Sequence, residues 1–242
     1  MENKKRTVRI IGPGKAGRSF GTVLERKGWI LEDYLGRNDD LQNAAQLVDL
    51  LVIATPDEMI SETAKKVTPN SKAVVAHLSG ALGLNVLNPH ESCMGFHPLA
   101  SLPDPHLGAD LLESGIWFGI SGHQLAKEIA VELGGKYFVV SDADRPLYHA
   151  AATVASNHLT ALLGQVERIA LSLDIPLEAF LNLVSGTIKN IESLGSIEAL
   201  TGPAARGDDQ TITQHLKALS EPEHSLYKML SDEARRLAEE KK

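Results

Sequence analysis

Short β-branched runs alternate with helix-forming stretches up to Val140, and this alternation constrains the fold more than any other feature of the sequence. It is typical of successive βα units, which build a parallel sheet covered by helices. The sequence therefore predicts an α/β fold with an N-terminal Rossmann domain. The predicted strands cover residues 7–11, 30–35, 50–54, 73–77, 94–96, 117–120 and 137–140.

The chain changes character after Asp142, where the strands stop and Ala, Leu, Glu and Lys become frequent. A long segment without an interior proline predicts a helix over residues 146–173, which is typical of the spine of a second domain or of a dimer contact. Further helices are predicted over 177–194, 210–219 and 224–240. We therefore divide the chain into a dinucleotide-binding domain, residues 1–142, and an all-helical dimerisation and substrate domain, residues 143–242.

Composition excludes several classes of partner. Hydrophobic residues make up 43% of the chain and charged residues 23%, as in ordinary globular proteins, and the net charge of -7 disfavours nucleic acid. No apolar run approaches the roughly 20 residues that span a bilayer, and no signal-peptide core precedes the first strand. We expect a cytoplasmic protein that binds neither membrane nor nucleic acid.

The cysteine and histidine content gives no sign of a cross-link or a metal. Cys93 is the single cysteine, so an internal disulfide is impossible, and we interpret it as a small buried hydrophobe rather than a nucleophile. The nine histidines lack C-x-x-C neighbours and a pair one helical turn apart. We expect no metal.

The stretch IIGPGKAG joins the first predicted strand to a helix and fits the spacing G-x-G-x-x-G. In a strand, turn and helix this spacing is the dinucleotide fingerprint, although a bare structural turn remains the alternative. Gly12 would permit the tight turn, Gly14 the close approach of a pyrophosphate, and Gly17 the packing of helix on strand. The residues expected to hold the pyrophosphate are Gly12, Pro13, Gly14, Lys15, Ala16 and Gly17.

The end of the second predicted strand indicates which dinucleotide is bound. NAD sites usually place an acidic residue there, whereas NADP sites need a cation for the extra phosphate. Gly36 and Arg37 stand at this end, while Glu32 and Asp33 lie mid-strand. We therefore favour NADP as cofactor, with Arg37 as a ligand, and NAD stays possible. A solvated loop residue is the alternative for Arg37.

Polar residues follow the next strands at the edge where ligands of open α/β sheets bind. Thr55 and Pro56 come just after the third strand and are assigned to cofactor binding, while Asp57 is interpreted as the cap of the next helix. His77 and Ser79 end the fourth strand, and their loop is expected to open on the same edge as the glycine loop. We assign His77 to the cofactor and Ser79 to orienting a carbonyl or imine.

Three further residues are candidates for the catalytic chemistry, namely His97, Asn157 and Lys189. His97, before Pro98, could act as acid, base or polariser of the substrate, or only hydrogen-bond a turn. On the long helix, His149, Thr153, Ser156 and Thr160 form one stripe at about 100° per residue, with Asn157 at its margin. That stripe would line the cofactor cleft or a dimer contact. Lys189, in LVSGTIKNIESLG, could protonate a substrate, or be solvated.

Several phrases together resemble a known family: IIGPGKAG, ATPD, HLSG, GFHPLASLPD, DRPLYHAAATVASNHLTALL, GTIKN and ALTGPAARGDDQTI. They are similar to Rossmann-like oxidoreductases with a C-terminal domain of unknown function, family 2520. More distantly, the order of parts resembles pyrroline-5-carboxylate reductase and prephenate dehydrogenase, within the 6-phosphogluconate dehydrogenase-like superfamily. The resemblance implies an NADP-binding domain and a helical domain that makes a homodimer.

The distant relatives suggest roles but no reaction. GFHPLAS is similar to the His-Pro segment of prephenate dehydrogenases, which implies His97 near the nicotinamide. SNHLTAL departs from their S-H-L-P-H phrase, so that Asn157 stands where they have a histidine, and ALTGPAARGD lacks the glycine-rich substrate loop of pyrroline-5-carboxylate reductases. Neither named reaction transfers to this chain.

Two functions therefore remain open. The first is an NADP-dependent oxidoreductase that transfers a hydride between NADPH and a small polar carbonyl or imine substrate in an interdomain cleft. The alternative is a non-catalytic NADP-binding sensor whose helical domain serves a protein partner. The polar side chains at the sheet edge favour the enzyme, because a sensor has less need of them.

Overall fold

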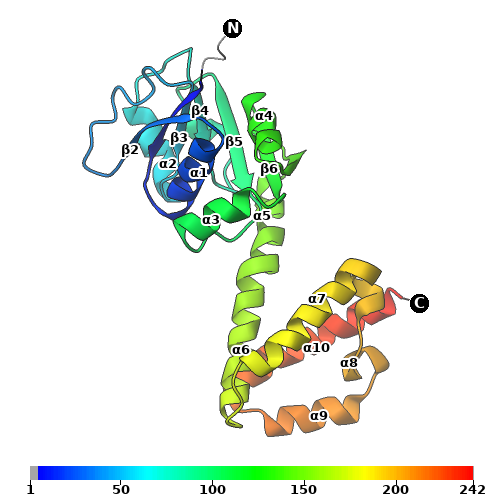
Figure 1. Cartoon of the computed structure of the whole chain (residues 1–242). Helices are drawn as coiled ribbons and strands as arrows, with labels where there is room; N and C mark the ends of the chain where they lie inside the picture. Colours follow the sequence, from blue (N-terminus) through cyan, green and yellow to red (C-terminus); the bar gives the residue numbers. More distant parts are fainter. Residues whose placement is uncertain (1–4, 242) are drawn as a thin grey trace. The chain divides into compact units, whose positions relative to one another are not determined.

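The computed structural model describes residues 5–241 and divides into two compact units. The first unit extends to Ser156 and holds the whole sheet, and the second begins at Asn157 and is helical (Figure 1). The boundary predicted between residues 142 and 143 falls one helix earlier, just before α5 (Arg145–Thr153). None of the helices in residues 5–241 has the length and apolar character needed to cross a bilayer.

The first unit is built on a seven-stranded sheet in the order β2-β1-β3-β4-β5-β6-β7 (Figure 1). Each strand overlaps a predicted one, and the predicted α/β class is confirmed. The strands are β1 (Thr7–Ile11), β2 (Ile30–Leu35), β3 (Leu50–Ile53), β4 (Val74–His77), β5 (Cys93–Pro98), β6 (Trp117–Gly122) and β7 (Lys136–Val139).

The expectation of a parallel sheet is wrong at its last two strands. The first five strands are parallel, but β6 pairs antiparallel with β5 and parallel with β7. The helix between β5 and β6 is α3 (Pro105–Leu112), and after it the chain enters β6 from the edge where β5 ends. The length of this helix does not decide the direction, because α4 (Leu125–Glu132), also of 8 residues, joins the parallel strands β6 and β7.

Both faces of the sheet are covered, so β3 and β4 are buried throughout. One face packs Phe96 and Phe118 against α1 (Lys15–Arg26), α3 and α4 (Leu125–Glu132). The other face packs Ile53 and Val75 against α2 (Asp57–Lys66) and the short 3-10 helix η1 (Leu84–Leu87). In β5 and β6 the residues directly before and after Phe96 and Phe118 point to this second face, because successive side chains of a strand alternate between its two faces.

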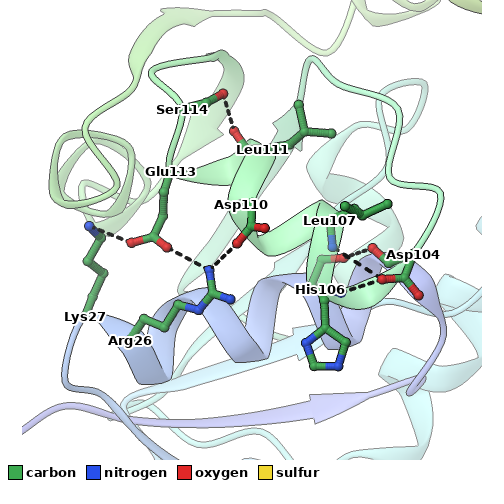
Figure 2. A network of polar contacts seen from close by, with 10 residues as sticks. Arg26, Lys27, Asp104, His106, Leu107, Asp110, Leu111, Glu113 and Ser114 are labelled. Atoms are coloured by element: carbon green, nitrogen blue, oxygen red, sulfur yellow. Dashed lines mark hydrogen bonds and ion pairs between the residues drawn. The ribbon is translucent and has the colours of Figure 1, made fainter.

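A group of charged side chains ties α3 to α1, the helix that follows the glycine loop (Figure 2). Arg26 Nη1 lies 2.7 Å from Asp110 Oδ1 and 3.0 Å from Glu113 Oε2, and Lys27 Nζ lies 2.9 Å from Glu113 Oε1. At the other end of α3, Asp104 Oδ1 accepts the backbone N–H of His106 at 2.9 Å, which caps the helix. These contacts fix the direction in which α1 leaves the glycine loop.

The long helix predicted over 146–173 forms, but not as a regular α-helix. After α5 the chain makes a π-helical segment, η2 (Val154–His158), and then continues as α6 (Leu159–Leu171). A π turn closes over i→i+5 hydrogen bonds and so contains more residues than an α turn. The predicted polar stripe, which assumed about 100° per residue throughout, is therefore wrong beyond Thr153.

The helices of the second unit lie close to their predicted positions. They are α7 (Glu178–Ala199), α8 (Pro203–Arg206), α9 (Asp209–Ala218) and α10 (Glu221–Glu239). Asp208 caps α9 by accepting the backbone N–H of Thr211 at 3.0 Å. Arg168 binds Glu223 through two bonds, Nε to Oε1 at 2.7 Å and Nη2 to Oε2 at 2.9 Å, which ties α6 to α10.

Two glycines of the loop before α1 give a matched test of the fold. Gly12 has φ +96°, and a Cβ there would lie 2.7 Å from Ala54 C, so Gly12→Ala should lower the free energy of unfolding by about 2 kcal/mol or more. Gly14 has φ -76° and open space around the Cβ position, so Gly14→Ala should change the free energy of unfolding by less than about 0.5 kcal/mol. Urea unfolding measures both, and equal losses would contradict this account.

Candidate active site

The carboxyl ends of β1, β3, β4 and β5 meet at one edge of the sheet because these strands are parallel. β1 lies between β2 and β3, so the strand order reverses there, which is where ligands of open α/β sheets bind. The loops that carry Gly12, Thr55, Ser79 and Pro98 all leave from this edge. The expectation that they open together is confirmed.

The glycine loop packs tightly against α1 at Gly17 and leaves free space around Gly14, where a ligand would approach. A Cβ on Gly17 would lie 2.2 Å from Gly12 O, so the first turn of α1 packs tightly on the loop. Gly14 has nothing within 4 Å of its Cβ position and caps α1 without a side-chain hydrogen bond. The first N–H groups of α1, in the turn of Lys15 and Ala16, are therefore available to an anion. This shape fits a pyrophosphate.

Two arginines lie near the end of β2. Arg37 is exposed and makes no hydrogen bond or ion pair within residues 5–241, while the backbone N–H of Gly36 donates to Asp39 Oδ2 at 2.6 Å. The guanidinium of Arg18, on α1, lies 5.2 Å from the centre of the Tyr34 ring. Arg37 was named from the sequence but Arg18 was not. Arg18 could have been noticed because it directly follows Gly17, the last glycine of the loop.

The turn after β3 leads into a contact with the turn after β4. Thr55 Oγ1 is buried without a partner in the described chain, and Pro56 is exposed at the start of α2. Asp57 is the first residue of α2 and does not cap it, so the prediction of a helix cap is wrong. Its Oδ2 instead accepts the Ser79 hydroxyl at 2.6 Å.

The Ser79 hydroxyl is fully used inside the protein. It donates to Asp57 and accepts the backbone N–H groups of Ala81 and Leu82, each at 3.2 Å. A hydroxyl offers one donor and two acceptor positions, so none is left for a substrate in this arrangement. The contacts fit a role in shaping the turn, and the predicted role in orienting a substrate stays a prediction.

Arg145, at the start of α5, is a functional candidate that sequence reasoning missed. Its side chain is fully buried and donates from Nη1 to Ser79 O at 3.1 Å and from Nη2 to Ser121 Oγ at 2.9 Å. It fits because Gly95 lacks a Cβ, which would lie 2.6 Å from Nη2. Burial lowers the pKa of its guanidinium. The available signal was an arginine and a proline directly after the last strand.

His97 lies among aromatic side chains supplied by α5. Its Nδ1 is 2.6 Å from Tyr148 Oη, and its ring meets the His149 ring nearly edge to face at 5.7 Å. Gly80 and Gly119 make room for this group. A Cβ on Gly80 would lie 2.5 Å from His149 Nδ1 and 2.9 Å from His97 Nε2, and one on Gly119 would lie 2.6 Å from Tyr148 Oη.

Both histidines at the strand ends are neutral at neutral pH. Burial lowers the pKa of His77 to about 4, with the Arg145 charge as a further cause. Burial also lowers the pKa of His97 to about 4, helped by His149 and Arg145. His97 can therefore polarise a substrate as a neutral imidazole rather than as an imidazolium.

The remaining predicted residues lie elsewhere. Asn157, in η2, and Lys189, in α7, belong to the second unit and are exposed, and their catalytic roles stay predictions. Cys93 is half-buried, its thiol donates to His90 O at 3.1 Å, and burial raises its pKa, which suits the expected packing role. Residues 5–241 contain no group of three His, Cys, Asp or Glu side chains placed to hold a metal.

The fold and this edge define a Rossmann-like protein with a dinucleotide-type loop and a helical second part. More particularly, residues 117–234 match the family model described as Domain of unknown function (DUF2520), so the chain carries this domain and the stated family resemblance is confirmed. The match starts at β6 and runs through most of the second unit. No curated protein matches the sequence.

Solved structures share the fold over nearly the whole chain. The provisionally named NADP oxidoreductase BF3122 from Bacteroides fragilis has a TM-score of 0.78 and 19% identity, covering 96% of this chain and 98% of its own. A reductive aminase from Aspergillus terreus, in complex with NADPH and ethyl-5-oxohexanoate, has a TM-score of 0.69 and 14% identity, covering 96% of this chain and 94% of its own. A 1-pyrroline-5-carboxylate reductase from Streptococcus pyogenes has a TM-score of 0.66 and 14% identity, covering 97% of this chain and 100% of its own. At these identities the likeness is one of fold.

The buried histidines predict a loss of stability in mild acid. The unfolded chain takes up a proton on His77 near pH 6.5 and the folded chain only near pH 4, so the free energy of unfolding should fall as the pH drops between these values. The loss for His77 is about 3 kcal/mol when complete. Urea unfolding of wild type and His77→Gln from pH 7 to pH 4.5 should show a shallower decline in the variant. Parallel curves would contradict the assignment.

Proposed function

We propose that the protein is an NADP-dependent oxidoreductase that transfers a hydride between NADPH and a small polar carbonyl or imine compound. The observation that carries the proposal is the free N-terminus of α1 at the same sheet edge as the neutral His97. β1 and β5 are separated by β3 and β4, about 14 Å at the usual strand spacing, a span that suits an extended dinucleotide.

The cofactor residues follow from this arrangement. The N–H groups of residues 14–17 would hold the pyrophosphate, as positive helix ends do. Arg37, with Arg18 beside it, would bind the extra phosphate of NADP. Thr55, Pro56 and His77 follow the neighbouring strands and would line the path toward the nicotinamide. The solved reductive aminase with bound NADPH supports this choice of cofactor.

The chemistry requires one group from the cofactor and several from the chain. NADPH, when bound, supplies the hydride that the substrate carbon accepts. His97 would donate a hydrogen bond to the reacting oxygen or nitrogen, and its burial makes that bond stronger than in water. Arg145 joins the turn after β4 to β6, and the Asp57–Ser79 bond joins the same turn to α2, which keeps Gly80 in place beside His97.

A binding titration followed by a turnover screen tests the proposal. NADPH is titrated into the protein by calorimetry, and keto acids, imino acids and hydroxy acids are then screened for a change in reduced-cofactor absorbance. NADPH binding with turnover of one class supports the enzyme. Tight binding without turnover of any class would favour the alternative, a non-catalytic NADP-binding sensor, and no binding would reject both.

We expect Arg37 to set the preference of the protein for NADPH over NADH. A charge-assisted contact contributes about 1.5 to 3 kcal/mol, so Arg37→Ala should weaken NADPH binding about ten- to hundredfold and leave NADH binding almost unchanged. Lys72→Ala, which removes an exposed cation before β4, is the matched control. Calorimetric titration measures the affinities of wild type and both variants for NADPH and for NADH. An unchanged ratio of NADPH to NADH affinity in Arg37→Ala would remove Arg37 from the site.

We also propose that the protein is a homodimer held by its second unit. Within the described part of that unit, Ala170 and Ile212 are the buried hydrophobic residues, and α7 buries none of its side chains. Large apolar side chains remain exposed instead, among them Leu181, Leu183, Ile188, Ile191 and Leu194 of α7. So little buried apolar surface cannot stabilise a helical unit alone, and a second copy would supply the missing contacts.

Charges placed on α7 should break this dimer. Leu181 and Ile188 lie seven residues apart and therefore on one side of the helix. The double variant Leu181→Glu and Ile188→Glu should behave as a monomer or unfold, because two carboxylates cannot be buried unpaired. Asn182→Glu adds one such carboxylate on another side of the helix and should stay dimeric. Size-exclusion chromatography with light scattering measures the mass, and a monomeric wild type would contradict the proposal.

A further inference from the structure

The geometry around His97 assigns a role to Tyr148. We propose that Tyr148 holds His97 in the tautomer with its proton on Nε2, so that the site donates a hydrogen bond to a carbonyl oxygen and disfavours a protonated imine. Tyr148 is thus a positioning residue that acts through His97. The inference rests on the proposed function and narrows its substrate class to carbonyl compounds in preference to imines that enter the site protonated.

Tyr148 reaches His97 because α5 fits the antiparallel pair of β5 and β6. His97 and Gly119 are direct partners across this pair, so their side chains would share one face. Gly119 has none, and Tyr148 Oη lies 2.6 Å from the position its Cβ would take. The next pair on this face, Gly95 and Ser121, receives Arg145 in the same way.

The hydrogen bond between Tyr148 and His97 has one favourable direction. Neutral imidazole carries a proton on one nitrogen and accepts at the other. Burial raises the pKa of Tyr148, so the phenol keeps its proton at neutral pH. A phenol is a stronger acid than the N–H of a neutral imidazole, and the bare imidazole nitrogen is a better acceptor than the phenol oxygen, so the 2.6 Å bond is stronger with the phenol as donor. Tyr148 therefore donates, Nδ1 accepts, and the imidazole proton stays on Nε2.

The Nε2–H group is left for a ligand. It makes no hydrogen bond within residues 5–241, and it faces the backbone of Gly80, where a Cβ would approach it to 2.9 Å. A carbonyl oxygen has lone pairs that accept this proton, whereas a protonated imine nitrogen is itself a donor. The buried cation of Arg145 adds repulsion against a positively charged substrate, and it acts on His97 more strongly than the opposing carboxylate of Asp57.

The proton steps balance in the direction of reduction. As hydride adds to the carbonyl carbon, the π electron pair moves to oxygen, and this oxygen takes the proton from His97 Nε2. His97 Nδ1 takes the phenolic proton of Tyr148, which leaves a phenolate in the electrostatic field of Arg145. A proton from solvent then binds Nε2 while Nδ1 returns its proton to the phenolate, which restores both the phenol and the starting tautomer. The product is an alcohol, and His97 is never required to carry a positive charge.

Nitrogen NMR of the protein without cofactor tests the tautomer directly. Protein labelled with ¹⁵N-histidine is compared at neutral pH with His97→Gln, which identifies the His97 signals. The proposal expects the Nε2–H pattern for His97 in the wild type and its loss or averaging in Tyr148→Phe. Tyr137→Phe, which changes an exposed tyrosine of β7, should leave the pattern unchanged. An Nδ1–H wild type, or an unchanged pattern in Tyr148→Phe, would overturn it.

Gly119→Ala provides a second variant, because it displaces the Tyr148 hydroxyl without removing it, and it should alter the His97 pattern in the same way. If both variants lost their fold by circular dichroism, the wild-type spectrum would still decide. In turnover, Tyr148→Phe should lower kcat for a ketone by about tenfold or more with little change in KM. A wild type that reduces a cyclic imine faster than the matching ketone would overturn the substrate class. The NMR result does not require NADPH binding, so it fails separately from the proposed function.

Discussion

The buried guanidinium of Arg145 is the contact on which the candidate site depends. It joins the start of α5 to the turn after β4 and to β6 through Ser79 and Ser121. A buried charge without a carboxylate in contact is expensive unless neutral groups solvate it, so both bonds must be present together. The segment that carries Tyr148 is thereby fixed over His97. Burial keeps the nearby histidines neutral, and the charge of Arg145 adds to this effect.

Absent side chains shape this region as much as present ones. Gly12 and Gly17 let α1 pack on the first turn and leave its N-terminus free, and Gly80, Gly95 and Gly119 let the side chains of α5 approach the sheet. In each place a Cβ would come closer than contact allows to backbone or to a functional side chain. The open turn before α1 and the imidazole group thus have one physical origin, close approach to bare backbone.

Much of this could be read from the sequence, because the relevant information is local. Strand positions follow from runs of β-branched residues, the glycine loop from fixed spacing between a strand and a helix, and the cap Asp208 from its place before a helix. The direction of β6 could not be read, because it depends on where α3 docks. The role of Asp57 could not be read for the same reason, since its partner Ser79 lies in another turn.

The sequence by itself determined the α/β class, the helical second part, the glycine loop and His97 as a candidate, since each depends on neighbours along the chain. Only the tertiary structure decided that Arg145 and Tyr148 belong with His97, because three separate elements must meet before any of them has its partner. Local chemistry selects which side chains are able to react. Packing selects which of them touch, and so which protonation state and tautomer each one keeps.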